Sequence, residues 1–498
     1  MTPFSSTEFL LILPEIILSV GAMILLLGAA FFKKNPTTYN SVLSIAILCA
    51  TLISVSFFSN GQRIMFNGLV ESNNFISFSK GLILVSAILS LLMIFQHLER
   101  YALARPELPL LMVFSVLGMM VMVSANDLMS LFLGMEIQGM STYVLAAFHR
   151  NDTRSNEAAV KYFILGALSS AIILYGFSLI YGFCGTTNFD GLNNVLRSFE
   201  GNNISLPLQF GVILILCGSA FKISAGPFHM WAPDVYEGVP TPVTAFFAAV
   251  PKLAALCVLV RLFMGPFAHI IPIIQVPLVI LAFLSIFVGG IAAIRQENIK
   301  RLLAYSSMGH VGFMLLGLVP QNNIGLQGML LYMLIYMLTT VAFFSCLISL
   351  KREGRPVENI SDFSGLFHQH PLMSIIVAGL MLSMAGIPPL AGFFGKFFII
   401  MGLANGGHIT IAVIAILGSV ISAYYYIRII KVIYFEKNQE VPKSLSQSKS
   451  GMGPVQVLQM PLTKFVLVST VIVVILVSIF PKYFYELTLV PVSVLTMH

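Results

Sequence analysis

Long apolar segments follow one another along almost the whole chain, separated mostly by short polar connections. An apolar helix of about twenty residues crosses the hydrocarbon core of a bilayer, so each segment predicts a transmembrane helix. About fourteen such helices are predicted, at residues 9–32, 39–60, 73–98, 107–125, 127–148, 156–183, 206–236, 241–263, 270–294, 298–318, 325–350, 371–405, 409–435 and 463–480. We therefore expect an all-α integral membrane protein.

The seventh and twelfth segments are too long for one straight crossing, and both contain proline. Pro227 follows Gly226 in the seventh segment, and Pro388 and Pro389 lie in the twelfth. Proline removes a backbone donor and frees carbonyl groups, which side chains or water must then satisfy. We expect helices 7 and 12 to be discontinuous, with a wet pocket beside Lys222 at the first break.

The spacing of these two breaks predicts an internal repeat. The breaks are five segments apart, so segments four to eight and nine to thirteen would have opposite topology, as in the inverted repeats of many transporters. The predicted division is flanking helices at 1–106, a first five-helix repeat at 107–263, a second, inverted repeat at 270–435, and a polar linker with a last helix at 436–498. A shift of 174 residues carries Glu136 onto His310 and Lys222 onto Lys396, although the two breaks do not align at that shift.

Composition supports the membrane interpretation and excludes other classes. Hydrophobic residues make up 57% of the 498 positions and charged residues only 9%, which is too little charge for a soluble surface. The net charge of +7 does not predict nucleic-acid binding, because the Lys and Arg residues lie in short loops between apolar segments. The five cysteines are scattered without a C-x-x-C pair, so neither a metal site nor an iron–sulfur cluster is expected.

The side on which the loop Lys and Arg residues fall predicts the orientation. Sorted by predicted side, most of them lie on one side, which should be cytoplasmic. The other side receives Arg63, Arg197, Arg261 and Lys482. With an even number of spans, both termini are expected to be periplasmic.

A few ionisable residues lie inside the apolar segments instead of in loops. Glu136, Lys222, Lys252 and Lys396 are deep within predicted spans, and a charge at that depth costs on the order of 3 kcal/mol unless it finds a partner or water. Lys80 lies nearer the end of its span and is expected to extend its amine to the interface.

Glu136 and Lys222 are the natural candidates for a proton switch. Burial favours the neutral forms of both groups, whereas an opposite charge in contact favours the charged forms. A Glu–Lys contact that opens and closes therefore moves a proton. The alternative is a static salt bridge that only fixes the packing of the helices.

Lys252, His310, Lys396 and His229 extend this set. His229 lies just beyond the first break and His310 among small residues, and histidine titrates near neutrality. We expect Glu136, Lys222, Lys252, His310 and Lys396 to form a row of ionisable groups at one depth. A structural hydrogen bond is the alternative for either histidine.

Several segments resemble a known family: LFLGMEIQGMSTYVLAAF, EAAVKYFILGALSSAIILYGFSLIYG, FKISAGPFHMWAPDVYEGVPTPVTAFFAAVPKLAAL, RLLAYSSMGHVGFMLLGL and AGIPPLAGFFGKFFI. They are similar to the antiporter-like membrane subunits of proton-pumping NADH:quinone oxidoreductase, respiratory complex I. The stretch PFHMWAPDVYEGVPTPVTAFF resembles the subunit N branch more than the L and M branches. By motif, Glu136, Lys222, Lys252 and Lys396 match the glutamate of the family's fifth helix and the lysines of its seventh, eighth and twelfth helices.

The resemblance implies a proton path in this chain, coupled to quinone reduction elsewhere in a larger complex. It implies an obligate hetero-oligomer with other membrane subunits in the lipid bilayer. The chain lacks a G-x-G-x-x-G loop, so NADH, FMN, iron–sulfur clusters and quinone are expected only in partner subunits. The presence of the first three spans favours a bacterial cytoplasmic (inner) membrane over a mitochondrial inner membrane.

Two other functions stay open from sequence. Subunits of multi-subunit cation/proton antiporters share the fold and the Glu/Lys pattern, although the subunit N wording favours the redox complex. A purely structural membrane subunit is the third alternative, and the buried ionisable residues argue against it.

Overall fold

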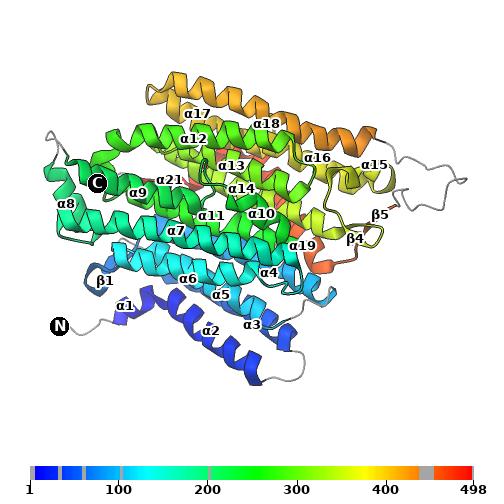
Figure 1. Cartoon of the computed structure of the whole chain (residues 1–498), viewed down its shortest axis with the longest axis horizontal. Helices are drawn as coiled ribbons and strands as arrows, with labels where there is room; N and C mark the ends of the chain where they lie inside the picture. Colours follow the sequence, from blue (N-terminus) through cyan, green and yellow to red (C-terminus); the bar gives the residue numbers. More distant parts are fainter. Residues whose placement is uncertain are drawn as a thin grey trace, which may run out of the picture.

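The computed structural model describes residues 6–31, 36–58, 63–100, 105–199, 204–436 and 454–495. Most of these residues lie in helices that run side by side along the long axis of the molecule (Figure 1). Two small β-structures mark the ends of this bundle. One is the β1–β2 hairpin, which defines the hairpin end, and the other is the β3–β4–β5 sheet, which defines the sheet end.

The first part of the chain forms helices at one edge of the bundle. They are α1 (Ser6–Leu11), α2 (Leu13–Phe31), α3 (Pro36–Phe58) and α4 (Asn74–Arg100). Between α3 and α4, β1 (Arg63–Met65), η1 (Phe66–Gly68) and β2 (Val70–Ser72) form an antiparallel hairpin in which Arg63 pairs with Ser72.

The next helices include the first break. They are α5 (Glu107–Ser124), α6 (Leu128–Ala146), α7 (Thr153–Cys184), α8 (Phe189–Ser198), α9 (Leu206–Lys222), α10 (Trp231–Gly238) and α11 (Thr241–Met264). Asp127, Asp152 and Asn188 cap α6, α7 and α8 by accepting hydrogen bonds from backbone amides of the first turn. The predicted interruption of the seventh segment is confirmed, since α9 ends at Lys222 and α10 begins at Trp231.

The second break lies in the following group. Its elements are η2 (Ala268–Ile270), α12 (Ile271–Ile294), α13 (Ile299–Leu316), α14 (Asn323–Ser349), β3 (Leu350–Arg352), β4 (Arg355–Pro356), η3 (Ile360–Phe363), α15 (Leu366–Gln369), α16 (Pro371–Ala385), α17 (Ala391–Asn405) and α18 (Ile409–Phe435). The twelfth predicted segment is divided into α16 and α17, and Gly386 ends α16 in the left-handed conformation with φ of 86°.

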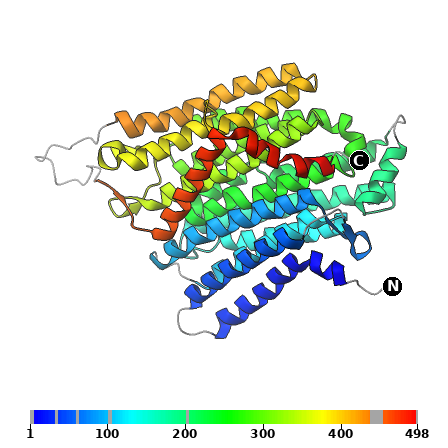
Figure 2. The same cartoon turned by 180° about the vertical axis from the view of Figure 1, so that it is seen from behind.

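The last described part runs back across the bundle. It consists of β5 (Val455–Val457), α19 (Pro461–Ile479), α20 (Pro481–Leu487) and α21 (Leu489–Leu495). Figure 2 shows these helices on the back face, with α21 pointing to the hairpin end, where α1 also lies. The linker predicted at 436–462 lies largely outside the described residues, but Leu350 pairs with Val457, so its end is a strand.

Ten helices in the described ranges are long and apolar enough to cross a membrane: α2, α3, α4, α5, α7, α11, α12 with η2, α14, α18 and α19. The shorter α9, α16 and α17 are the broken helices. The predicted spans 127–148 and 298–318 correspond to α6 and α13, which are not among these ten helices. The chain is therefore a multi-pass membrane protein.

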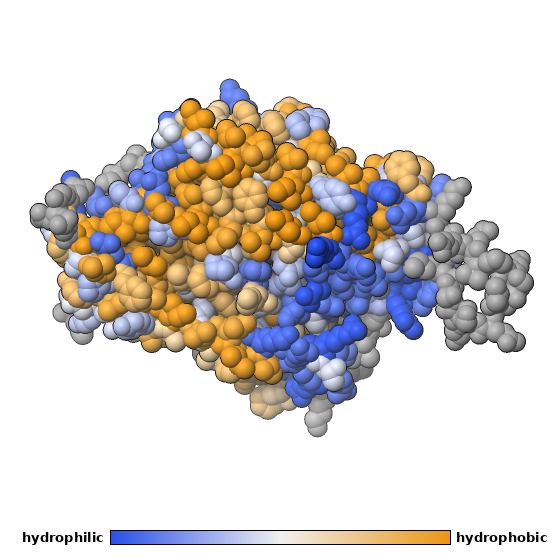
Figure 3. All heavy atoms as spheres, turned by 45° about the horizontal axis from the view of Figure 1, so that its top comes forward, coloured by the Kyte–Doolittle hydropathy of each residue, from blue (hydrophilic) through white to orange (hydrophobic). Residues whose placement is uncertain are grey.

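Burial differs sharply among these helices. The apolar windows of α11 and α14 are 100% and 94% buried, whereas those of α2, α18 and α19 are each only 33% buried. Figure 3 shows a broad apolar area on one face, with hydrophilic residues gathered toward the sheet end on the right. The outer helices thus present an apolar surface suited to lipid, and α11 and α14 form the centre.

Close helix packing in the bundle depends on glycine. A Cβ atom on Gly118 of α5 would lie 2.4 Å from the backbone nitrogen of Gln138 in α6. A Cβ atom on Gly134 of α6 would lie 2.5 Å from the backbone nitrogen of Met122. Only residues without side chains allow two backbones to approach this closely.

The expectation that Lys80 reaches the interface is wrong. Its side chain is 6% exposed, and its Nζ lies 2.6 Å from Oε1 of Glu15 in α2. Ser124 of α5 also donates a hydrogen bond to this carboxylate. A partner from a distant segment neutralises the lysine inside the bundle, which the local pattern around Lys80 does not predict.

Candidate functional site

The break between α9 and α10 is closed by specific hydrogen bonds. The indole Nε1 of Trp231 donates to the carbonyl oxygen of Phe221 at 2.9 Å, and the backbone amide of Gly226 donates to Ser285 Oγ of α12 at 2.8 Å. Groups that would bond within an unbroken helix therefore find partners from other segments. This arrangement fixes the end of α9, where Lys222 is the last residue.

Lys222 places its amine in a small cavity within the bundle. The Nζ atom is buried and has no hydrogen-bond partner in the described part of the chain. The cavity has a volume of about 10 Å³ and is lined by Met122, Met135, Gln138, Ser219, Lys222, Ala255 and Val258. A water-sized space beside an unsatisfied amine is a suitable site for a bound water molecule.

Glu136 lies on α6 close to this amine, but the predicted direct ion pair is not formed in the structure. Glu136 instead accepts a hydrogen bond of 2.5 Å from Ser170 of α7. A Cβ atom on Gly139, one turn along α6 from Glu136, would be 3.4 Å from the Lys222 amine. Carboxylate and amine are thus neighbours without being in contact.

Lys252 joins the two parts of the bundle. It follows Pro251 within α11, its side chain is fully buried, and its Nζ donates to Ser307 Oγ of α13 at 2.6 Å. The amine also faces the ring of Tyr236, with 5.1 Å to the ring centroid. A hydroxyl and an aromatic face are the partners that stabilise this buried amine.

His310 is held between two tyrosines. Its Nδ1 lies 2.7 Å from the hydroxyl of Tyr332 in α14, and its Nε2 lies 2.8 Å from the hydroxyl of Tyr426 in α18. Both ring nitrogens therefore have a partner that is able to donate or accept. A cavity of about 10 Å³ is lined by both His310 and Ser307, which places the histidine next to the partner of Lys252.

Lys396 lies beside the second break. Its Nζ donates to the carbonyl oxygen of Ala385, at the end of α16, and to Ser419 Oγ of α18, each at 2.9 Å. Its amine faces the ring of Phe313, with 4.9 Å to the ring centroid. The break frees the Ala385 carbonyl, and the lysine satisfies it.

His229 does not join the row. It lies in the segment between α9 and α10, and its Nδ1 is buried without a hydrogen-bond partner among the described residues. Its ring centroid is 6.0 Å from that of Tyr305. No direct hydrogen bond links it to Lys222 in the described structure.

Intervening residues connect the members of the predicted row, which are Glu136, Lys222, Lys252, His310 and Lys396. Ala255, which lines the Lys222 cavity, is one turn from Lys252 on α11. Ser307 joins Lys252 to the cavity at His310. Tyr332, which contacts His310, also packs against Gly395, the neighbour of Lys396. A Cβ atom added to Gly395 would lie 2.3 Å from the Tyr332 ring.

Sequence reasoning missed the residues that complete these contacts: Ser170, Ser307, Tyr332, Tyr426 and Ser419. Serine and tyrosine occur throughout apolar helices, so residue type alone does not single them out. Their role becomes visible only through contacts between helices that are distant in the chain.

A separate ion-pair network lies toward the sheet end. Lys161 Nζ lies 2.7 Å from Glu157 Oε1 of the same helix, and the same amine lies 2.7 Å from Asp234 of α10. Arg301 of α13 bridges Asp234 and Glu237 at 2.9 and 2.8 Å. The network connects the first break to the second part of the bundle.

A known family and curated relatives match this chain. The family described as "NADH:quinone oxidoreductase/Mrp antiporter, TM" matches residues 125–422. NADH-quinone oxidoreductase subunit N of Paramagnetospirillum magneticum is 47% identical over 86% of this chain and 88% of the relative. The subunit N of Beijerinckia indica is 41% identical over 96% of each chain.

Solved structures agree with these matches. A chain of respiratory complex I from Thermus thermophilus is 28% identical, with a TM-score of 0.78 over 95% of this chain and 98% of that chain. A chain of the Mrp complex from Dietzia sp. has a TM-score of 0.83 over 100% of this chain and 98% of that chain, but at 19% identity it shows only the fold.

The fold and the buried ionisable groups define a multi-pass membrane protein of the antiporter-like class. The chain belongs to the NADH:quinone oxidoreductase/Mrp antiporter family and, by its 41–47% identity to the relatives named subunit N, to the subunit N branch of that family.

Proposed function

We propose that this chain conducts protons along its row of buried ionisable groups, as a membrane subunit of NADH:quinone oxidoreductase in the bacterial cytoplasmic membrane. The electron-transfer reaction takes place in partner subunits, and no NADH, FMN, iron–sulfur centre, quinone or metal binds to this chain. The observation that carries the proposal is the contact of Lys252 with Ser307, since it joins the Lys222 side of the bundle to the His310 side.

Each residue has a distinct role in the proposed path. A Glu136 carboxylate in contact with Lys222 stabilises the protonated amine, and Lys222 releases its proton when the two groups separate. Lys252 exchanges protons with His310 through Ser307 and cavity water, and the two tyrosine contacts of His310 make it a relay. Lys396 lies at the end of the row opposite Lys222. His229 is an access relay at the first break.

Two similar isolated β-bridges between backbone segments support the division into inverted repeats at 107–263 and 270–435. Asp127, the cap of α6, pairs with Asn188 near the hairpin end, and Asn298, the cap of α13, pairs with Asn359 near the sheet end. Each pair joins a cap to a residue that follows a long helix, α7 or α14. Equivalent contacts at opposite ends are expected when two repeats are inverted.

The proposed topology has fourteen spans, with α9–α10 and α16–α17 each counted as one broken crossing. The sheet end then faces the cytoplasm, because Lys161, Lys300, Arg301, Arg352 and Arg428 all lie toward it. The hairpin end, with both termini, faces the periplasm. Residues 1–106 and 436–498 flank the repeats.

Substitution of Lys252 by methionine tests the proposed path. Methionine retains the apolar volume of the side chain but carries no proton, so we expect proton pumping by the reconstituted complex to fall about tenfold. The measurement is the rate of acidification inside proteoliposomes, together with the rate of quinone reduction. Lys431→Met is the matched control, because Lys431 is exposed on α18 and its charge is outside the row. An assembled Lys252→Met complex that pumps at the control rate contradicts the proposal.

A cation/proton antiporter subunit is the second candidate function, and the fold shared with the Mrp chain is its specific support. Purification of the native complex distinguishes the two functions. The redox function requires the chain to copurify with flavin-containing and iron–sulfur subunits. Copurification with only membrane subunits, and cation exchange without NADH oxidation, would favour the antiporter.

A further inference from the structure

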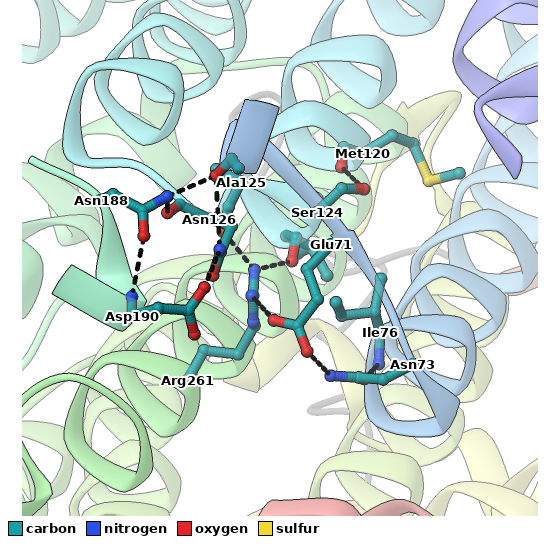
Figure 4. A network of polar contacts seen from close by, with 12 residues as sticks. Glu71, Asn73, Ile76, Met120, Ser124, Ala125, Asn126, Asn188, Asp190 and Arg261 are labelled. Atoms are coloured by element: carbon teal, nitrogen blue, oxygen red, sulfur yellow. Dashed lines mark hydrogen bonds and ion pairs between the residues drawn. The ribbon is translucent and has the colours of Figure 1, made fainter. Parts of the chain in front are cut away.

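A polar cluster at the hairpin end, reaching from buried Arg261 to the surface at Asp190, is outside the row of groups described above. We call Glu71, Asn73, Asn126, Asp190 and Arg261 the hairpin-end cluster. Figure 4 shows the Arg261 side chain directed between Glu71 and the end of α5. Its Nη2 lies 2.5 Å from Glu71 Oε2, and the Arg261 side chain is only 6% exposed. The sequence places this arginine at the end of the predicted span 241–263, and it lies in the last turn of α11.

Arg261 also binds the carbonyl groups at the end of α5. Its Nη1 donates to the carbonyl oxygens of Val123 at 2.6 Å and Ala125 at 2.5 Å. The last carbonyls of a helix lack partners within the helix and carry partial negative charge, so a guanidinium stabilises them. Because an arginine stays protonated, Arg261 is a fixed positive charge that positions Glu71.

The cluster lines a cavity of about 60 Å³ that is large enough for water. Glu71, Asp190 and Arg261 line it, and Asp190 is exposed at the protein surface. Asn193 of α8 also lines it, with an Oδ1 atom that is buried and without a hydrogen-bond partner among the described residues. An unsatisfied oxygen facing a polar cavity is the expected surrounding of a bound water molecule.

The cluster lies next to the Lys222 cavity. Val258 of α11 and Met122 of α5 line that cavity. On α11, Arg261 is one turn beyond Val258, which corresponds to a rise of about 4.5 Å. On α5, Arg261 donates a hydrogen bond to the carbonyl oxygen of Val123, which directly follows Met122. The apolar side chains of Met122 and Val258 therefore lie between the Lys222 cavity and the hairpin-end cluster.

From this juxtaposition we infer that the hairpin-end cluster is the exit of the proton path, with Glu71 as the group that takes the proton from Lys222. The N–H bond of the Lys222 ammonium breaks, and a water molecule carries the proton past Met122 and Val258 to the Glu71 carboxylate, where an O–H bond forms. That bond then breaks, and the proton passes to cavity water and to bulk water near Asp190. Arg261 keeps its protons throughout and acts as a positioning residue. The inference depends on the proposed function.

Accessibility of Asn193 tests the exit directly. In the complex reconstituted into oriented proteoliposomes, Asn193→Cys should react with an anionic, membrane-impermeant methanethiosulfonate added on the hairpin-end side. The modified side chain fills the cavity, so the rate of proton pumping should fall about tenfold. Asn194→Cys is the matched control, because Asn194 is exposed on the same helix and does not line the cavity. The untreated variants and the treated wild-type complex control for the native cysteines.

The exit is excluded if modified Asn193→Cys pumps as fast as modified Asn194→Cys. A second variant, Glu71→Gln, removes the proton acceptor but keeps a side chain of the same shape, and it should lower pumping to a similar extent. Arg352→Gln is its control, because Arg352 is also buried and binds backbone carbonyls, but at the sheet end.

Lys222→Ala separates failure of the exit from failure of the proposed function. If Lys222→Ala lowers pumping whereas Glu71→Gln and modified Asn193→Cys do not, only the exit is wrong. If Lys222→Ala also pumps at the wild-type rate, the proton path itself is wrong.

Discussion

Replacing Lys222 by alanine is expected to lower the rate of proton pumping at least about tenfold, while the complex still assembles. The pumping rate falls because no other amine lines the Lys222 cavity. Assembly is retained because the Lys222 Nζ makes no hydrogen bond to the described residues, so its removal leaves no partner unsatisfied. The measurements are acidification in proteoliposomes and the amount of this chain in the purified complex.

Two further variants sharpen this test. Ser219→Ala changes the lining of the same cavity without removing a charge, and it should pump at close to the wild-type rate. Lys222→Arg retains a charge that does not release its proton, so it should pump no better than Lys222→Ala. If Lys222→Ala assembled and moved as many protons per quinone as the wild type, a purely structural role would be supported instead.

Replacing Gly392 by alanine is expected to destabilise the chain by about 3 kcal/mol or more, because it overpacks two backbone segments. A Cβ atom at Gly392, near the start of α17, would lie 1.8 Å from the carbonyl oxygen of Ser383 in α16. The two halves of the broken helix would have to separate, and the bond from the Gly392 amide to Ser383 Oγ would be lost. The measurements are the yield of assembled complex and its thermal unfolding.

Gly379→Ala is the matched control for this substitution. Gly379 lies within α16, and a Cβ atom there would meet nothing within 4 Å. Alanine has a higher helix propensity than glycine by about 1 kcal/mol, so this variant should be as stable as the wild type or more stable. Equal losses of stability in both variants would mean that the helix, and not the contact at the break, is sensitive to substitution.

The two helix breaks show which features of the fold the sequence predicts and which it does not. The prolines at Pro227 and Pro388 predicted two interrupted helices, and both interruptions are present. The hydrogen bonds at the two breaks were not predictable from the sequence. Trp231 donates to Phe221 and Lys396 donates to Ala385 only because the surrounding helices hold the chain in the required conformation at each break. The order of residues along the chain already places Lys222 before its break and Lys396 after its break, at the end of α9 and within α17.

Two charged residues show where local reasoning fails. Lys80 and Arg261 are near the ends of their helices, a position from which a long side chain normally reaches water. Both are buried instead, because Glu15 and Glu71 from distant segments neutralise them. Pairing of this kind depends on how the helices pack, so the order of charged residues along the sequence does not predict it.

The sequence by itself determined that this protein lies in a membrane, where its helices break, and which residues carry charge into the apolar interior. These properties follow from the free energy of placing each short segment in lipid, which depends on that segment alone. The tertiary structure decided which groups meet. Lys252 reaches Ser307 across 55 positions and His310 reaches Tyr426 across 116, because helix packing and not chain order brings these side chains together.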